Sequence, residues 1–126
     1  DMEAAVEIND NNGSLVFELS CGDIDILFNG DMDGSLLSQV CAAAGAETEI
    51  IKVPHHGSKS GYAAELAQLL ESEAAVISVG RNNSYGHPAS KVVEYWQEHG
   101  EVYRTDNDGS VSLFTNGIEY QILTYH

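Results

Sequence analysis

Hydrophobic and polar residues alternate with a period of two along the first part of the chain. This alternation is typical of half-buried strands and predicts strands over Glu3–Ile8, Ser14–Ser20 and Ile24–Phe28. The runs NDNNG and CGD between them consist of residues that favour tight turns. Short turns between consecutive strands predict an antiparallel meander.

After Phe28 the apolar residues recur with the spacing of a helix. This spacing predicts helices over Ser35–Ala44, Tyr62–Leu70 and Ala89–His99. Asp33 or Ser35 could cap the first helix, and Gly45 ends it. Pro88 cannot lie inside a helix, so the third helix begins after it.

Apolar strands are expected between these helices, over Glu49–Val53, Ala74–Val79 and Glu101–Arg104. A strand, a helix and a second strand at this length indicate a βαβ unit with parallel strands. A hairpin is expected to close the chain, with Asn-Gly between the strands Ser110–Thr115 and Ile118–Tyr125. Residues 1–126 therefore predict a single α/β unit, an α+β sandwich with a mixed sheet and about three helices.

Composition limits the function classes. The 126 residues suit one domain or part of a larger one, and 43% hydrophobic content is enough for a core. No stretch approaches the ~20 apolar residues of a membrane span. No signal peptide is visible and the chain begins at Asp1, so we expect an excised piece or a processed product.

The net charge of −15 argues against a stand-alone binder of the nucleic-acid backbone, which needs a basic face. It does not argue against phosphoester hydrolysis, because bound divalent metals invert the sign of the local field. Cys21 and Cys41 are far apart in sequence. Two small core residues are the favoured interpretation, and a disulfide stays open.

Two strand ends carry metal-ligating residue types. Asp31 follows the apolar run that ends in FNG, and His55 and His56 follow the run IIKVP. A carboxylate and an imidazole at the rim of a sheet suit a hydrolytic metal site. Asp31 could instead cap a helix, and the histidines could be ordinary loop residues. In extended backbone the two rings would point to opposite sides, so only one would bind the ion directly.

Other candidates lie close by. Ser58 and Lys59 follow the histidines, and contact with an anion is favoured over a serine nucleophile with a lysine base. His87, between Gly86 and Pro88, could be a general acid or a phosphate contact, or part of an ordered surface loop.

Two further sequence features can contact a substrate phosphate. Asn83 and Tyr85 lie in the same loop as His87 and are candidate contacts. Arg104 is a third candidate, although an ion pair with Asp106 is usually structural.

Taken in order, the runs LFNGDMD, KVPHHGSKS, ISVGRNNSYGHP and VYRTDNDGSV resemble one family. They are similar to the C-terminal half of the metallo-β-lactamase-like domain of ComEC/Rec2-type DNA-internalization (competence) proteins and related metal-dependent hydrolases. The resemblance spans nearly the whole chain. It implies half of an αββα fold with zinc or manganese at the sheet edge.

The resemblance also implies roles for single residues. Asp31 would bridge two metals, His56 would be the last metal histidine, and His55 would be the second choice. His87 would lie over the metal edge as a phosphate contact or acid. The implied chemistry is attack of metal-activated water on a phosphodiester, with DNA as the substrate of the full-length protein.

One part of the family pattern is missing. The HxxxDH-type motif of the first half does not occur among the five histidines of this chain. We therefore expect the isolated chain to bind metal weakly, to hydrolyse little, and to need the rest of the parent polypeptide. A lone half also exposes an apolar sheet face, which predicts a homodimer.

Alternatives remain. The segment could be a non-catalytic binding or structural module of a DNA-uptake membrane protein. It could also belong to a metal hydrolase of a lactone, thioester or cyclic nucleotide, because one scaffold serves many reactions. The resemblance implies a parent protein in the cell membrane, with this domain on the extracytoplasmic side and no membrane insertion by the segment itself.

Overall fold

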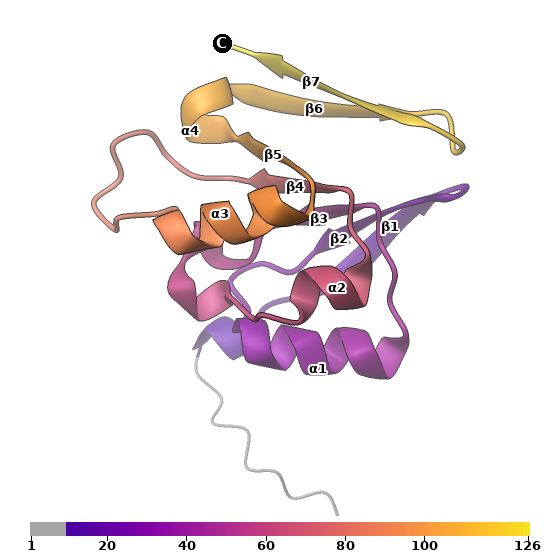
Figure 1. The fold of residues 1–126 in the computed structure, drawn as a ribbon, viewed down its shortest axis with the longest axis horizontal. Helices are drawn as coiled ribbons and strands as arrows, with labels where there is room; N and C mark the ends of the chain where they lie inside the picture. The colour runs from indigo at the N-terminus through magenta and orange to yellow at the C-terminus, as the bar shows by residue number, and fades with distance from the viewer. Residues whose placement is uncertain (1–9) are drawn as a thin grey trace, which may run out of the picture.

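The computed structural model describes residues 10–126, and its centre is a five-stranded sheet in the order β1-β2-β3-β4-β5 (Figure 1). β1 pairs antiparallel with β2, and β2 through β5 run parallel to one another. The strands are β1 (Phe17–Cys21), β2 (Ile24–Phe28), β3 (Ile50–Lys52), β4 (Ala74–Ile77) and β5 (Glu101–Arg104). The carboxyl ends of four strands therefore meet at one edge of the sheet.

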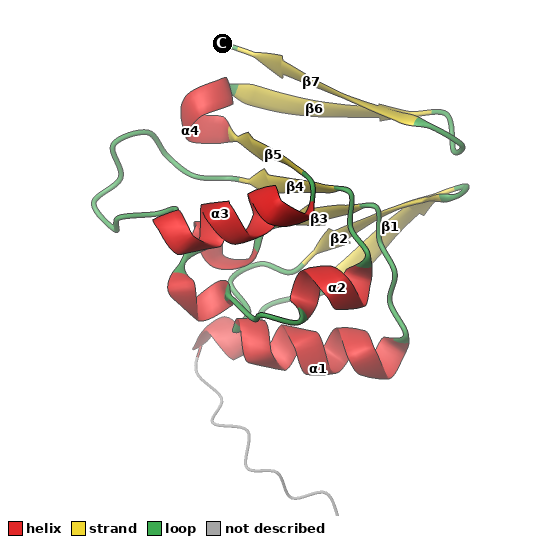
Figure 2. Cartoon of the chain, viewed as in Figure 1, coloured by secondary structure: helices red, strands yellow, loops and turns green. Residues whose placement is uncertain are grey.

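Three helices cover one face of this sheet (Figure 2). They are α1 (Gly34–Ala44), α2 (Leu66–Leu70) and α3 (Ser90–His99). Leu37, Leu66 and Trp96 from these helices pack against the buried side chains of β3 and β4 in the main core. Asp33 caps α1 by accepting the backbone N–H of Ser35 at 2.9 Å.

A hairpin lies on the other face, formed by β6 (Ser110–Thr115) and β7 (Tyr120–Tyr125). A cavity of about 480 Å³ separates it from the sheet. The cavity is lined by Ile26, Phe28, Ile50, Val76, Val111, Leu113 and Ile122, with Lys52, Ser78 and Thr105 completing the lining. The hairpin therefore fills the apolar face of the sheet only in part.

Short helical turns complete the chain. They are η1 (Asp10–Gly13), η2 (Pro54–Gly57), η3 (Lys59–Gly61) and the one-turn α4 (Thr105–Asp108). Within residues 10–126, no helix is both long and apolar enough to cross a bilayer.

The structure confirms the α/β class and the mixed sheet, with corrections. The strand expected over Glu3–Ile8 lies outside the described residues, so only two strands of the meander are seen. α2 begins at Leu66 rather than Tyr62, because the preceding turn η3 ends with Tyr62 in extended backbone. The turn expected at Asp106 is instead the helix α4.

The two cysteines are both free thiols. Cys41 is buried in the main core, as expected, and its burial raises the pKa of its thiol. Cys21 lies exposed at the end of β1, so the core interpretation is wrong for this residue.

Candidate metal centre at the carboxyl edge of the sheet

Every site residue expected from the sequence lies at or after the carboxyl end of a parallel strand. Asp31 follows β2, His55 and His56 follow β3, and His87 follows β4. Arg104 is the last residue of β5. The topology therefore gathers the candidates at one edge, where open α/β sheets bind their ligands.

The turn that carries Asp31 is held from two sides. Gly30 has a φ of 55°, which favours glycine, and a Cβ there would lie 3.0 Å from the Cβ of Ser14. The hydroxyl of Ser14 accepts the backbone N–H of Asp31 at 3.2 Å. The carbonyl of Gly30 accepts the backbone N–H of His55 at 3.0 Å, which joins this turn to the next.

The backbone at the two histidines is left-handed, not extended. His55 has φ 49° and His56 has φ 56°, and Gly57 follows with φ 79°. The expected extended backbone is therefore wrong, and the rings are aimed by a left-handed turn. Such conformations cost a non-glycine residue about 1 kcal/mol or more and persist only where the surroundings impose them.

The third strand end is attached to the same turn. The backbone N–H of Ala89 donates to the carbonyl of Gly57 at 2.9 Å. A Cβ on Gly57 would lie 2.6 Å from the Cβ of Pro88. Only glycine fits this close approach, so the turns after β2, β3 and β4 form one connected assembly.

This assembly brings Asp31 and His56 together. The Nε2 atom of His56 lies 3.4 Å from Oδ1 of Asp31. The Nδ1 atom of the same ring lies 2.7 Å from the carbonyl oxygen of Ser78. A carbonyl only accepts, so Nδ1 carries a proton, and in the neutral form of the ring Nε2 is the atom left to bind a cation.

The donor set is small. Within the described part of the chain, no group of three or more His, Cys, Asp or Glu side chains is arranged to hold a metal ion. Asp31 and His56 supply an oxygen and a nitrogen donor, whereas a catalytic zinc has three protein ligands. The pair therefore provides two ligands at most.

His55 faces a different neighbour. Its Nδ1 atom lies 2.8 Å from the hydroxyl oxygen of Ser60. Its ring centroid is 5.8 Å from that of His87 and 6.3 Å from that of His56, both in edge-on geometry. The three imidazoles therefore form a row along the edge, with His55 in the middle.

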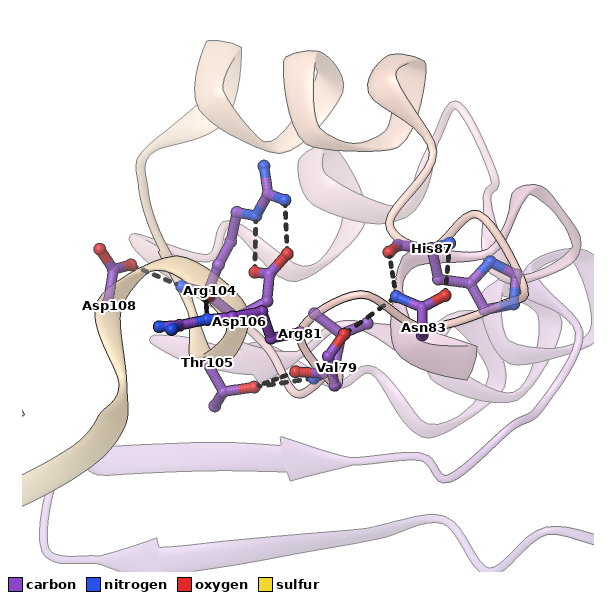
Figure 3. A network of polar contacts seen from close by, with 9 residues as sticks. Val79, Arg81, Asn83, His87, Arg104, Thr105, Asp106 and Asp108 are labelled. Atoms are coloured by element: carbon purple, nitrogen blue, oxygen red, sulfur yellow. Dashed lines mark hydrogen bonds and ion pairs between the residues drawn. The ribbon is translucent and has the colours of Figure 1, made fainter. Parts of the chain in front are cut away.

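The loop with His87 is fixed by one amide side chain (Figure 3). The Nδ2 group of Asn83 donates to the carbonyls of Gly80 at 3.0 Å and His87 at 2.7 Å. Its Oδ1 atom accepts the backbone N–H groups of Tyr85 and His87, both at 3.1 Å. Asn83 therefore supports the loop with both ends of its amide, and its role as a phosphate contact stays a prediction.

Ser58 is also engaged locally. Its hydroxyl accepts the backbone N–H of Ser60 at 3.3 Å and lies 3.1 Å from the hydroxyl of Ser60. It caps the turn η3 rather than meeting a base. The ammonium group of Lys59 makes no hydrogen bond or ion pair with residues 10–126, which leaves it available to an anion.

Arg104 forms a bidentate ion pair with Asp106, through Nε at 3.0 Å and a terminal nitrogen at 2.7 Å (Figure 3). The hydrogen bond and charge of Arg104 lower the pKa of the Asp106 carboxyl, and Asp106 raises the pKa of the guanidinium. Arg81 donates its Nε–H to the carbonyl of Asp106 at 3.2 Å. This geometry favours the structural role of Arg104, and its phosphate role stays a prediction.

Several supporting residues had no assigned role in the sequence. The Thr105 hydroxyl bonds both the N–H and the carbonyl of Val79 at 2.8 Å, which ties α4 to the start of the loop (Figure 3). Asn29 is fully buried and donates to the carbonyl of Lys52 at 2.7 Å, which links the ends of β2 and β3. Burial lowers the pKa of the Lys52 ammonium. A small polar residue directly after an apolar run is the only sequence signal for Asn29, and Ser78 acts through its backbone.

The positive charges share this edge. The chain has five lysines and arginines, and all lie at or just after the carboxyl ends of β3, β4 and β5 or in the first turn of α3. They are Lys52, Lys59, Arg81, Lys91 and Arg104. The opposite ends of the strands carry a hollow with four acidic side chains, Asp23, Glu49, Glu73 and Glu119. Ile24, Ile118 and Tyr120 complete its lining. The charge is therefore distributed unevenly over a strongly acidic protein.

Comparisons with known proteins relate the chain to competence proteins. It is 35% identical over 111 residues to the ComE operon protein 3 of Bacillus subtilis, covering 86% of this chain and 14% of that protein. It is 29% identical over 121 residues to the competence protein ComA of Neisseria gonorrhoeae, covering 92% of this chain and 18% of that protein. Recombination protein 2 of Haemophilus influenzae is 31% identical over 115 residues, 89% of this chain and 14% of that protein.

The chain thus spans less than a fifth of the length of these curated relatives. No protein-family model matches it, and no solved structure matches it. The similarity supports the expected relation to competence and DNA-uptake proteins.

Proposed function

We propose that this chain, a relative of one segment of competence proteins, contributes Asp31 and His56 to the metal centre of a phosphodiester hydrolase. The observation that carries the proposal is the 3.4 Å approach of Asp31 Oδ1 to His56 Nε2, with Nδ1 of His56 occupied by the Ser78 carbonyl. The hydrolase would act on DNA within a competence-related uptake protein of the cell membrane, with this domain on the extracytoplasmic side.

The donor chemistry suits a divalent cation. Ligands of one zinc ion lie about 2.0–2.2 Å from it in tetrahedral geometry, so two donors of the same ion are about 3.3–3.6 Å apart. The observed 3.4 Å is close to that separation. A hydrogen bond from the second ring nitrogen to a carbonyl is the usual way to orient a metal-binding histidine. Zinc or manganese accepts this oxygen and nitrogen pair.

When bound, such a cation would lower the pKa of water and polarise a phosphoryl oxygen. The residues of this chain would orient its ligands and hold the substrate. Ser78 fixes the tautomer of His56, and the turn at Gly30 holds Asp31 opposite it. The remaining protein ligands would come from the longer polypeptide, which fits the missing HxxxDH-type motif.

His87 would act as a general acid that protonates the leaving group. Its imidazole lies in the row of rings beside His55, and Asn83 bonds its backbone on both sides. A rigidly held imidazole can give a proton to a departing oxygen at neutral pH. Lys59 would offset the phosphate charge, because its ammonium group has no partner among residues 10–126.

The test uses the longer polypeptide that carries this chain together with its flanking regions. It should hydrolyse an aryl phosphodiester in the presence of Zn²⁺ or Mn²⁺, and Asp31→Asn should lower the rate at least a hundredfold. Activity that survives Asp31→Asn would overturn the proposal in favour of a non-catalytic module. Activity on a lactone or thioester, without phosphodiesterase activity, would place the same centre in another hydrolase.

A further inference from the structure

We propose that Tyr85 and the cleft beside it bind a nucleobase of single-stranded nucleic acid, next to the metal centre. The cleft has a volume of about 320 Å³ and is lined by Ser58, Lys59, Tyr85, Gly86, His87 and Ala89. This inference rests on the proposed function and goes beyond it, because it assigns recognition of the base rather than of the phosphate.

Tyr85 is an exposed aromatic residue with a defined orientation. Its relative exposure is 80%, which is unusual for a large ring in an ordered loop. The ring stacks on His87, with centroids 5.8 Å apart and an angle of 17° between the two ring planes. One face of the ring is therefore supported, and the high exposure leaves the other face open to a flat partner.

The loop holds this ring in place before any ligand arrives. Asn83 accepts the backbone N–H of Tyr85 at 3.1 Å and donates to the carbonyl of His87 at 2.7 Å. The backbone on either side of Gly86 is thus fixed by one amide side chain. A preorganised ring loses little conformational freedom on binding, so stacking on it is favourable.

The other wall of the cleft supplies a positive charge. Lys59 is exposed, and its ammonium group has no partner among the described residues. A cation beside an open aromatic ring suits the phosphate and the base of one nucleotide. Neutral aromatic ligands would use the ring alone, so the lysine favours a nucleotide.

The position of the cleft suits one nucleic-acid strand that also reaches the metal centre. His87 supports Tyr85 on one side and lies 5.8 Å, between ring centroids, from His55 on the other. His55 in turn adjoins His56, the proposed metal ligand. A strand with a phosphate at the metal centre could therefore place another of its nucleotides near Tyr85.

The experiment is an NMR titration of the 126-residue chain, with EDTA present and at low salt, using a thymidine tetranucleotide as the probe. Chemical-shift changes should concentrate at residues 58–59 and 85–89. An abasic tetranucleotide with the same phosphates should bind about tenfold more weakly, because it lacks the base that would stack on Tyr85.

Three variants complete the test. Tyr85→Ala should weaken binding about tenfold, and Tyr85→Phe should retain it within about twofold, because the ring rather than the hydroxyl carries the contact. Tyr125→Ala is the matched control, since Tyr125 is also 80% exposed but lies at the end of β7. Equal binding of the abasic probe, or an equal loss with Tyr125→Ala, would overturn the inference.

The readout separates this inference from the proposed function. EDTA removes divalent metal, so base binding is measured without hydrolysis. Binding without activity of the longer polypeptide would support the cleft and contradict the hydrolase. Activity of the longer polypeptide, together with equal binding of the thymidine and abasic tetranucleotides, would support the hydrolase and contradict the cleft.

Discussion

Asp31 and His56 lie 3.4 Å apart although neither side chain is buried, with 40% and 46% of their surfaces exposed. An exposed pair of this kind gains little from its own attraction in water. Its geometry is set instead by the backbone, through the Gly30 carbonyl that accepts the N–H of His55 and through the left-handed turn that follows. The two groups are therefore positioned by the fold before any ligand is present.

Zinc binding by the isolated chain tests this pair. We expect weak binding by calorimetric titration, and Asp31→Asn should weaken it at least tenfold, because one of two donors loses its charge. Asp33→Asn is the control, since asparagine caps a helix as well as aspartate does and Asp33 caps α1. Tight, stoichiometric zinc in the isolated chain would contradict the incomplete ligand set.

The contact between Gly57 and Pro88 should be sensitive to a single methyl group. Gly57→Ala should lower the free energy of unfolding by about 2–4 kcal/mol, because φ is 79° and the new Cβ would lie 2.6 Å from that of Pro88. Gly80→Ala is the control, with no heavy atom within 4 Å of the added Cβ. It should change stability by about 0.5 kcal/mol or less in urea unfolding.

The Arg104–Asp106 ion pair should make stability depend on acid pH. The folded-state pKa of Asp106 is lowered from its ordinary value of 3.8, so the contribution is present above that value and is lost as pH falls through the folded pKa. Asp106→Asn should cost about 1–2 kcal/mol near neutral pH and progressively less below pH 4. In an Arg104→Gln background the same change should have almost no further effect, and a full second loss would contradict the pairing.

Apolar side chains on the outer face of the hairpin should favour self-association. Phe114 and Leu123 are 58% and 47% exposed, and they alternate with Leu113 and Ile122, which line the cavity between the hairpin and the sheet. We expect a dimer at micromolar concentration in light scattering, and Phe114→Ser with Leu123→Ser should shift it toward monomer. Val40→Ser, on the exposed side of α1, should have no such effect. A monomer at this concentration in the unsubstituted chain would contradict the expectation.

Local patterns predicted the elements whose limits are set by local chemistry. The strand Ile24–Phe28 was predicted with its observed bounds, because an apolar run ends at turn residues on both sides. α1 begins after the Asp33 cap and ends at Gly45 in left-handed backbone, as the sequence indicates. Because the strands that precede Asp31 and His56 were expected to be parallel, their carboxyl ends were expected at one edge of the sheet. The two side chains meet at that edge.

The turn at His55 could not be predicted in the same way. Positive φ is uncommon for any residue other than glycine, and nothing within HHGS demands it at the histidines. The conformation is imposed by distant partners, namely the Gly30 carbonyl before it and Pro88 packed on Gly57 after it. The structural role of Asn83 could not be predicted from the sequence either, because its four hydrogen bonds form only in the folded loop.

The placement of the lysines and arginines makes one end of the parallel strands less negative than the other. The lysines and arginines lie toward one end and the hollow lined by Glu49, Glu73 and Glu119 lies at the other. The net charge of −15 repels a polyanion. The repulsion is weaker at the end that carries His55, His56 and His87, so a polyanion would collide with that end more often than with the rest of the protein. Encounter would then be selective in orientation and would lose that selectivity as ionic strength rises.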